Sequence, residues 1–186
     1  MTPRTWFDYT RPVADLSFDA VVAERIGDAE QARRLRAVAA TAIACEQVGG
    51  AASALEHAVS YAQIRTQFGR PIGSFQSIKH LCAEMLLAVE SGRAAARRAA
   101  RAIDDNDHEL EVFASIAKAW CSGAYVHAAE SSLQIHGGIG FTWEHVAHLH
   151  VKRAKADEFL FGDARHHREL LAELLGLTAL KGDHRE

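Results

Sequence analysis

The first segment whose residue types could do chemistry runs from Arg65 to Gln76 and reads RTQFGRPIGSFQ. Arg65 offers a planar set of hydrogen-bond donors. The amides around Ser74, where a new helix is predicted to begin, carry the positive end of a helix dipole. An arginine and a helix N-terminus together can bind a pyrophosphate from two sides. An ordinary helix hairpin explains the same residues, and the segment alone favours that simpler interpretation.

The second unusual segment, from Gln134 to Thr142, reads QIHGGIGFT. Three glycines in four residues, Gly137, Gly138 and Gly140, let a backbone approach another molecule closely. The segment follows a predicted helix rather than a strand, so it is not a dinucleotide fingerprint of the Rossmann kind. A plain helix terminus explains it almost as well.

Apolar spacing and capping residues predict the elements that carry these segments. From residue 28 onward, apolar residues recur at intervals of three, four or seven, as in amphipathic helices. A polar residue able to act as an N-cap precedes each stretch, and glycines and a proline mark their ends. We predict five helices, over residues 28–68, 74–104, 106–136, 142–159 and 163–176, with N-terminal caps at Asp28, Ser74, Asn106, Thr142 and Asp163.

The loops between these helices are short, which indicates an antiparallel arrangement. The fold class is therefore all-α, an antiparallel helical bundle of about five helices, preceded by a short extended segment. Residues 6–9 and 16–18 are interpreted as extended pieces because prolines and β-formers cluster there. The predicted organisation is an extended segment over 1–27 and a bundle over 28–180, with a frayed tail over 181–186.

Bulk composition limits the classes of function. The chain has 186 residues, 48% hydrophobic and 24% charged, which suits one compact unit. A net charge of −3 gives no general attraction to nucleic acid or membranes, and the arginines at 93, 97, 98 and 101 are interpreted as a solvated helix face. Three separated cysteines favour a reducing, cytoplasmic setting without disulfides. No signal sequence or uninterrupted membrane-length apolar run is present, so we expect a soluble protein.

The histidines do not have the spacing of a helical zinc site. His145, His148 and His150 lack a pair four residues apart, and His166 and His167 are adjacent. We interpret these five histidines as solvated or interface residues, and we predict no metal site.

Taken together, the two glycine-containing segments resemble the acyl-CoA dehydrogenase family in residue types, order and separation. Residues 29–176 are similar to the C-terminal helical domain of that family. Residues 1–24, especially Asp8 to Arg11 and the Phe18-Asp19 pair, are similar to the strand that leaves its middle β domain. The resemblance implies FAD as the cofactor and an acyl-CoA thioester as the substrate of the full assembly.

The resemblance also implies which residues contact the cofactor. The Arg-x-x-Phe-Gly motif and a later glutamine imply FAD contacts from Arg65, Phe68 and Gln76. The Gln-x-x-Gly-Gly motif reaches the FAD of a neighbouring subunit in the family, and it corresponds here to Gln134, Gly137 and Gly138. Since one cofactor then needs two copies of the domain, the resemblance implies a homo-oligomer or a heteromer. Residues 141–145 resemble bacterial members that act on bulky acyl chains.

The chain departs from the family at the catalytic base. The family reaction removes an α-proton while a hydride leaves the β-carbon for the flavin, so a carboxylate is required. The matching position holds Phe161, and a second family position, at about Ala39, holds alanine. The nearby carboxylates Asp157, Glu158 and Asp163 are interpreted as surface or capping groups, and Glu46 as a hydrogen-bonded structural residue.

No base is assigned, and the chain resembles the subunit type that lacks the glutamate in heteromeric family members. The resulting hypothesis is a non-catalytic subunit or fragment that contacts FAD. The alternative is an isolated structural or oligomerisation domain that binds no cofactor on its own. A generic helical interaction module would require both motifs to be coincidental.

Overall fold

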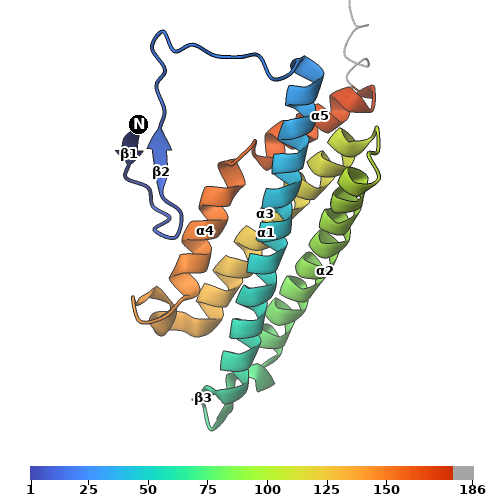
Figure 1. Ribbon diagram of the computed structural model, residues 1–186. Coiled ribbons are helices and arrows are strands. Elements are labelled where there is room, and N and C mark those ends of the chain that lie inside the picture. Colours follow the sequence, from blue (N-terminus) through green and yellow to red (C-terminus); the bar gives the residue numbers. More distant parts are fainter. Residues whose placement is uncertain (178–186) are drawn as a thin grey trace, which may run out of the picture.

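The computed structural model describes residues 1–177 and contains a helical bundle with two short β-hairpins (Figure 1). Residues 178–180 of the predicted bundle and the predicted frayed tail 181–186 lie outside the described residues. The α-helices of the described part are α1 (Ala29–Ile64), α2 (Gln76–Asp104), α3 (Leu110–His136), α4 (Ala147–Phe159) and α5 (Ala164–Leu174). The all-α class with about five helices is thus confirmed.

Helix α3 is the central element of the bundle. It contacts each of the other four helices, and α1 and α2 also contact one another. In Figure 1, α1 and α3 run downward and α2 runs upward. The end of α1, the start of α2 and the end of α3 therefore lie at one end of the bundle. The other end of the bundle holds the start of α1 and the turn between α4 and α5.

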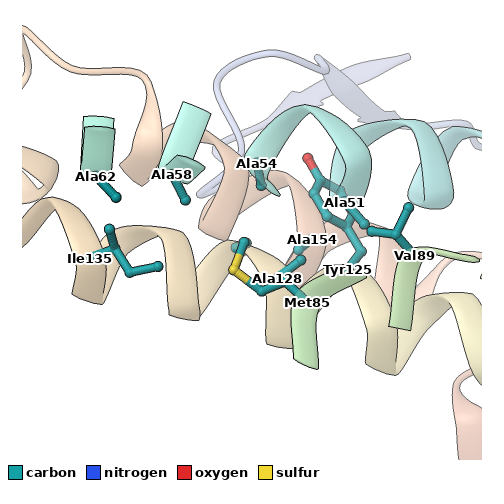
Figure 2. Close-up of a cluster of buried hydrophobic side chains, with 11 residues drawn as sticks. Ala51, Ala54, Ala58, Ala62, Met85, Val89, Tyr125, Ala128, Ile135 and Ala154 are labelled. Atoms are coloured by element: carbon teal, nitrogen blue, oxygen red, sulfur yellow. The ribbon is translucent and has the colours of Figure 1, made fainter. Parts of the chain in front are cut away.

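The core is built largely from alanine, which lets the helices approach closely. Ala51, Ala54, Ala58 and Ala62 line the buried face of α1. Larger side chains fill the remaining space, and Figure 2 shows Ile135 of α3 facing the alanines near the end of α1. Helix α1 is long and apolar enough to cross a membrane by length and composition, but a core helix passes the same test, and its alanines pack inside the bundle.

The predicted N-terminal caps of two helices are confirmed. Asp28 and Gln31 form a reciprocal capping box at α1, in which the Asp28 carboxylate accepts from the Gln31 amide at 2.8 Å. Asp163 caps α5 by accepting from the His166 amide at 2.8 Å.

The predicted end of the first helix is wrong by four residues and the predicted start of the second by two. Helix α1 ends at Ile64 rather than Phe68, because β3 (Thr66–Gln67) and β4 (Arg70–Pro71) form a hairpin. Ser74 does not cap α2, because it lies in the 3₁₀ helix η1 (Ile72–Ser74) and its hydroxyl donates to the Pro71 carbonyl at 2.7 Å. Helix α2 begins at Gln76 instead.

The next two predicted caps are also wrong. Asn106 adopts a left-handed φ of 52° before α3, and Asp107, not Asn106, accepts from the Glu109 amide at 2.9 Å. Thr142 follows the 3₁₀ helix η2 (Gly137–Phe141), and its hydroxyl donates to the Ile139 carbonyl at 2.9 Å. Helix α4 therefore starts at Ala147. At Thr142, the side-chain bond to a nearby carbonyl competes with helix capping.

The N-terminal segment contains strands, but not at the predicted positions. β1 (Thr2–Arg4) pairs antiparallel with β2 (Val13–Asp15), whereas residues 6–9 lie in the connection and 16–18 follow the hairpin. The hairpin lies beside α4 in Figure 1. Its connection is fixed to the bundle by charged side chains described below.

Candidate cofactor-binding end and the turn at Phe161

The β3–β4 hairpin presents the first motif on the surface. Arg65 follows the last residue of α1, and its carbonyl accepts from the Ile72 amide at 2.8 Å. Its side chain is exposed and makes no ion pair or hydrogen bond within residues 1–177. The guanidinium donors of Arg65 are therefore available to an anion.

The hairpin turn consists of Phe68 and Gly69, with φ values of 53° and 77°. Two successive positive φ values are the signature of a type I′ turn, which matches the twist of a two-stranded hairpin. A phenylalanine is strained in this conformation, and its ring is 91% exposed. Gln76 is exposed at the start of α2, so the three residues implied for the cofactor all lie on the surface of one corner.

Close packing between η1 and α1 shapes this corner. A Cβ at Gly73 would stand 2.9 Å from the Ala62 carbonyl oxygen, so only glycine lets the turn approach the helix this closely. Arg70 places its guanidinium 4.1 Å from the centre of the Phe75 ring, which adds a second positive charge to the corner.

The second motif forms the end of α3. Gln134 is exposed in the last turn, and Gly137 ends the helix with a φ of 61°. A Cβ built at Gly137 or Gly138 would meet nothing within 4 Å. The glycines therefore leave open space in front of the backbone, and the left-handed φ at Gly137 disfavours any other residue there.

Stacked rings bring the two motifs together. The Tyr61 ring, near the end of α1, stacks on the His136 ring at a centroid distance of 4.5 Å. His136 also contacts His145, at 4.2 Å between ring centroids. The His136 Nδ1 donates to the Ser132 carbonyl at 2.7 Å, and burial lowers the pKa of its ring. The predicted site residues thus share one end of the bundle.

The donor set at this end has the chemistry that a flavin dinucleotide requires. A pyrophosphate needs positive charge and amide donors, which Arg65, Arg70 and the glycine backbone offer. A planar ring system needs an exposed apolar surface, which Phe68 offers. The residues present therefore fit the cofactor implied by the resemblance.

Phe161 lies far from this end, in the turn between α4 and α5. Phe161 and Gly162 have φ values of 57° and 102°. The Phe161 side chain lines a cavity of about 170 Å³ together with residues of α1, α3 and α5, which are Arg33, Arg36, Ala37, Glu111, Ala114, Ser115, His166, His167 and Leu170. Glu111, a carboxylate that the sequence analysis did not single out, is 3.7 Å from Arg33.

The separation between the two regions follows from the length of α1. Phe161 shares its cavity with Ala37, near the start of α1, and Ala39 lies in the same half of that helix. From Ala39 to Ile64 the helix advances 25 residues, about 38 Å at 1.5 Å per residue. One copy of the chain therefore cannot bring its motif residues and its positions 39 and 161 to the same reacting atoms.

Glu46 and Asp157 belong to one charged network through Arg11, whereas Asp163 caps α5. Glu46 accepts from Arg11 at 2.7 Å and from Arg153 at 2.8 Å, which confirms its structural interpretation. Arg153 also pairs with Asp8 at 3.2 Å. The network fixes the connection of the N-terminal hairpin to α1 and α4.

The surface interpretation of Asp157 is wrong. Its side chain is fully buried, one oxygen pairs with Arg11, and the other oxygen has no partner in the described residues. Burial raises the pKa of this carboxyl. Glu158, by contrast, is half-buried and pairs with Lys155 at 3.6 Å.

The interpretation of the five histidines as solvated or interface residues is wrong for His167, which is buried inside the chain. His167 is 4% exposed and His150 is half-buried, and burial lowers the pKa of each ring to about 4. His150 contacts the Tyr125 hydroxyl through its Nδ1 at 3.1 Å. Their positions depend on helix packing, which the spacing of histidines does not reveal.

A helical bundle with an exposed cationic and glycine-rich end is what the resemblance to acyl-CoA dehydrogenases predicts, and comparison with known families agrees. Residues 30–176 match the model of the acyl-CoA dehydrogenase C-terminal domain. The chain belongs to the acyl-CoA dehydrogenase family.

Particular relatives support this assignment. The chain is 42% identical over 170 residues to acyl-CoA dehydrogenase FadE34 of Mycobacterium tuberculosis, covering 89% of this chain and 23% of FadE34. It is also similar to a chain of the ChsE4–ChsE5 complex from the same species, with 27% identity and a TM-score of 0.77, covering 82% of this chain and 41% of that one.

A third similarity concerns the cofactor. The structure of PigA with FAD and proline matches with 28% identity and a TM-score of 0.73, over 77% of this chain and 37% of PigA. FAD is the cofactor of the family, which confirms that prediction at the family level. The chain spans about a quarter of the length of FadE34 and less than half of either structural relative.

Proposed function

We propose that this chain is the FAD-contacting part of an acyl-CoA dehydrogenase assembly and that a partner chain supplies the catalytic carboxylate. Arg65, Phe68 and Gln76 would hold FAD at one corner, and Gln134, Gly137 and Gly138 would hold it from the end of α3. The bound FAD would accept the hydride lost by the β-carbon of an acyl-CoA. The observation that carries the proposal is the exposed motif end combined with Phe161 at the position of the base.

The distance along α1 supports the need for a second chain. Position 39 and the motif end are separated by about 38 Å, at 1.5 Å per residue, so we expect a complete site to combine the motif end of one chain with the region around positions 39 and 161 of another. The chain has an apolar surface suited to such an assembly. Leu87, Ile116 and Trp120 are 69%, 42% and 51% exposed on α2 and α3.

Members of the fold form assemblies of two chain types, as in the ChsE4–ChsE5 complex. A heteromer with a catalytic dehydrogenase subunit is therefore the favoured assembly, and a homo-oligomer is the other form consistent with the motifs. Free thiols at Cys45, Cys82 and Cys121 fit the proposed cytoplasmic location.

The test is to purify the chain alone and together with a dehydrogenase subunit encoded beside it, and to record the visible flavin spectrum of each sample. Flavin that appears only with the partner, with acyl-CoA-dependent reduction of that flavin, is the expected result. A stable oligomer without flavin in both samples would favour the alternative, an isolated structural or oligomerisation domain. Full activity of the chain alone would contradict the need for a partner.

Variants sharpen this test because glycine substitutions separate binding from folding. Gly138→Ala meets open space in the chain itself, so it should fold normally but reduce bound flavin if the cofactor approaches this backbone. Gly123→Ala also meets open space, on the exposed side of α3 away from the motif, and is the matched control. Arg65→Met should likewise lower the flavin-to-protein ratio, whereas Arg165→Met, at an exposed site on α5, should not.

A further inference from the structure

The turn between α4 and α5 is held by side chains that contact its main chain. Lys118 of α3 is fully buried, and its ammonium donates to the Glu158 carbonyl at 3.1 Å and to the Gly162 carbonyl at 2.9 Å. Its third donor is used by the Ser122 hydroxyl at 2.9 Å. All three donors of the ammonium therefore have acceptors, which a buried lysine requires.

His167 binds the carbonyl of Phe161, which lies between Glu158 and Gly162 in the sequence. Its Nε2 is 3.1 Å from the Phe161 carbonyl, and its Nδ1 is 3.2 Å from the Ser115 hydroxyl. Because a carbonyl can only accept, the Nε2 must carry the proton, and the neutral ring accepts from Ser115. The imidazole thus links the Phe161 carbonyl to α3 with a defined tautomer.

These contacts stabilise a backbone conformation that Phe161 does not favour. Phe161 has a φ of 57°, a left-handed conformation that disfavours residues with a side chain. Gly162 has a φ of 102°, and a Cβ there would stand 3.2 Å from the His167 Nε2. A strained residue such as Phe161 persists where its surroundings hold it, and residues of this kind gather at functional sites.

We propose that Lys118 and His167 are positioning residues that hold the turn 158–163 through its carbonyls and thereby fix the side chain of residue 161 against the cavity that it lines. We name Lys118, His167 and Ser115 the carbonyl clamp. Each hydrogen bond from the clamp to the turn ends on a main-chain oxygen, so these bonds do not depend on which side chain residue 161 carries. The importance of position 161 for an acyl site rests on the proposed function.

Because the hydrogen bonds of the clamp do not involve the Phe161 side chain, replacing that side chain gives the first test. Phe161 is 53% exposed, so Phe161→Glu should change stability little. The unfolding midpoint should stay within about 2 °C of that of the parent chain. Lys118→Met should lower the midpoint clearly, because it leaves the carbonyls of Glu158 and Gly162 without their donor. A large loss in Phe161→Glu would show that the phenyl ring holds the turn and would overturn the proposal.

The second test measures the environment of the residue 161 side chain rather than the stability of the chain. The chain is labelled with fluorophenylalanine, and the fluorine NMR line of residue 161 is assigned by its disappearance in Phe161→Leu. His167→Leu should move that line toward the position found in the denatured chain. His167→Gln, which keeps an amide donor for the Phe161 carbonyl, should restore it.

A matched control separates positioning from a general loss of stability. Val89→Ala removes core volume in α2, away from the turn, and should lower the unfolding midpoint without moving the line of residue 161. An unmoved line in folded His167→Leu, or equal movement in Val89→Ala, would overturn the clamp. Neither test uses flavin or a partner chain, so a failure of the proposed function would leave both results interpretable.

Discussion

Gly50 of α1 packs closely against the ring of Tyr125 of α3. A Cβ at Gly50 would stand 2.7 Å from the Tyr125 Oη and 2.8 Å from its Cε1, distances that no real Cβ tolerates. Tyr125 is 3% exposed and belongs to the main core cluster in Figure 2, so its ring has little room to move. The two helices are therefore in contact through a glycine and an aromatic ring.

This contact predicts that Gly50→Ala destabilises the bundle. The added methyl group must displace the tyrosine or separate α1 from α3, and overpacking of this kind costs about 1 to 3 kcal/mol. The neighbouring substitution Gly49→Ala is the control, because a Cβ there meets nothing within 4 Å. Alanine in an exposed helix position gains up to about 1 kcal/mol over glycine. Urea denaturation should therefore move the two variants in opposite directions, and equal shifts would contradict the packing argument.

The buried pair of Arg11 and Asp157 predicts a second large effect. Arg11→Met leaves the Asp157 carboxylate, which is fully buried, without its partner. Removing one member of a buried pair costs about 3 to 5 kcal/mol, although protonation of Asp157 can relieve part of this. The same substitution at Arg4, whose pair with Asp15 is more than half exposed, should change stability by less than about 1 kcal/mol.

The Arg11 variant should also release the N-terminal hairpin. Arg11 and Arg153 connect the segment around Asp8 to Glu46 and α4, so limited proteolysis should cut the first 27 residues faster in Arg11→Met than in Arg4→Met. Equal cutting rates would show that other contacts hold the segment.

Local signals in the sequence predicted local features of the fold. The capping box of Asp28 and Gln31 and the cap at Asp163 depend only on residues three positions apart, and both are confirmed. Ser74 and Thr142 have the same residue type as a cap, but their hydroxyls bind carbonyls within 3₁₀ turns. Whether a hydroxyl caps a helix or closes a turn depends on the backbone that follows, which spacing alone does not determine.

Only part of the site could be predicted from the sequence. The motif residues were identified by resemblance, and the structure brings their two segments to one end through the Tyr61–His136 stack. The roles of Lys118 and His167 were not predicted, because both residues bind main-chain carbonyls that follow no sequence pattern. The carbonyls bound by Lys118 are 40 and 44 residues away, and the one bound by His167 is 6 residues away. One signal was available, since Lys118 falls between Ala117 and Ala119 on an otherwise apolar stretch of α3. A lysine at a buried helical position requires acceptors from elsewhere in the fold.

The buried imidazole of His167 predicts how stability depends on pH. Burial lowers the pKa of folded His167 to about 4, whereas an unfolded histidine takes up its proton near about 6.5. Between these values the unfolded chain binds more protons than the native chain. The free energy of unfolding therefore falls as the pH is lowered through this window, by up to about 1.4 kcal/mol per pH unit for this residue. Above the window the imidazole is neutral in both states and contributes no pH dependence.

The measurement is urea denaturation at a series of pH values across the same window. His167→Gln removes the titrating ring but keeps a donor for the Phe161 carbonyl, so its stability should fall less steeply with decreasing pH than that of the parent, by up to one bound proton. His108→Gln, at a side chain that is 93% exposed, serves as the control and should retain the parental slope. Since burial also lowers the pKa values of His150 and His136, part of the slope should persist in His167→Gln. A parental slope in His167→Gln would mean that the native state protonates His167 as readily as the unfolded chain does.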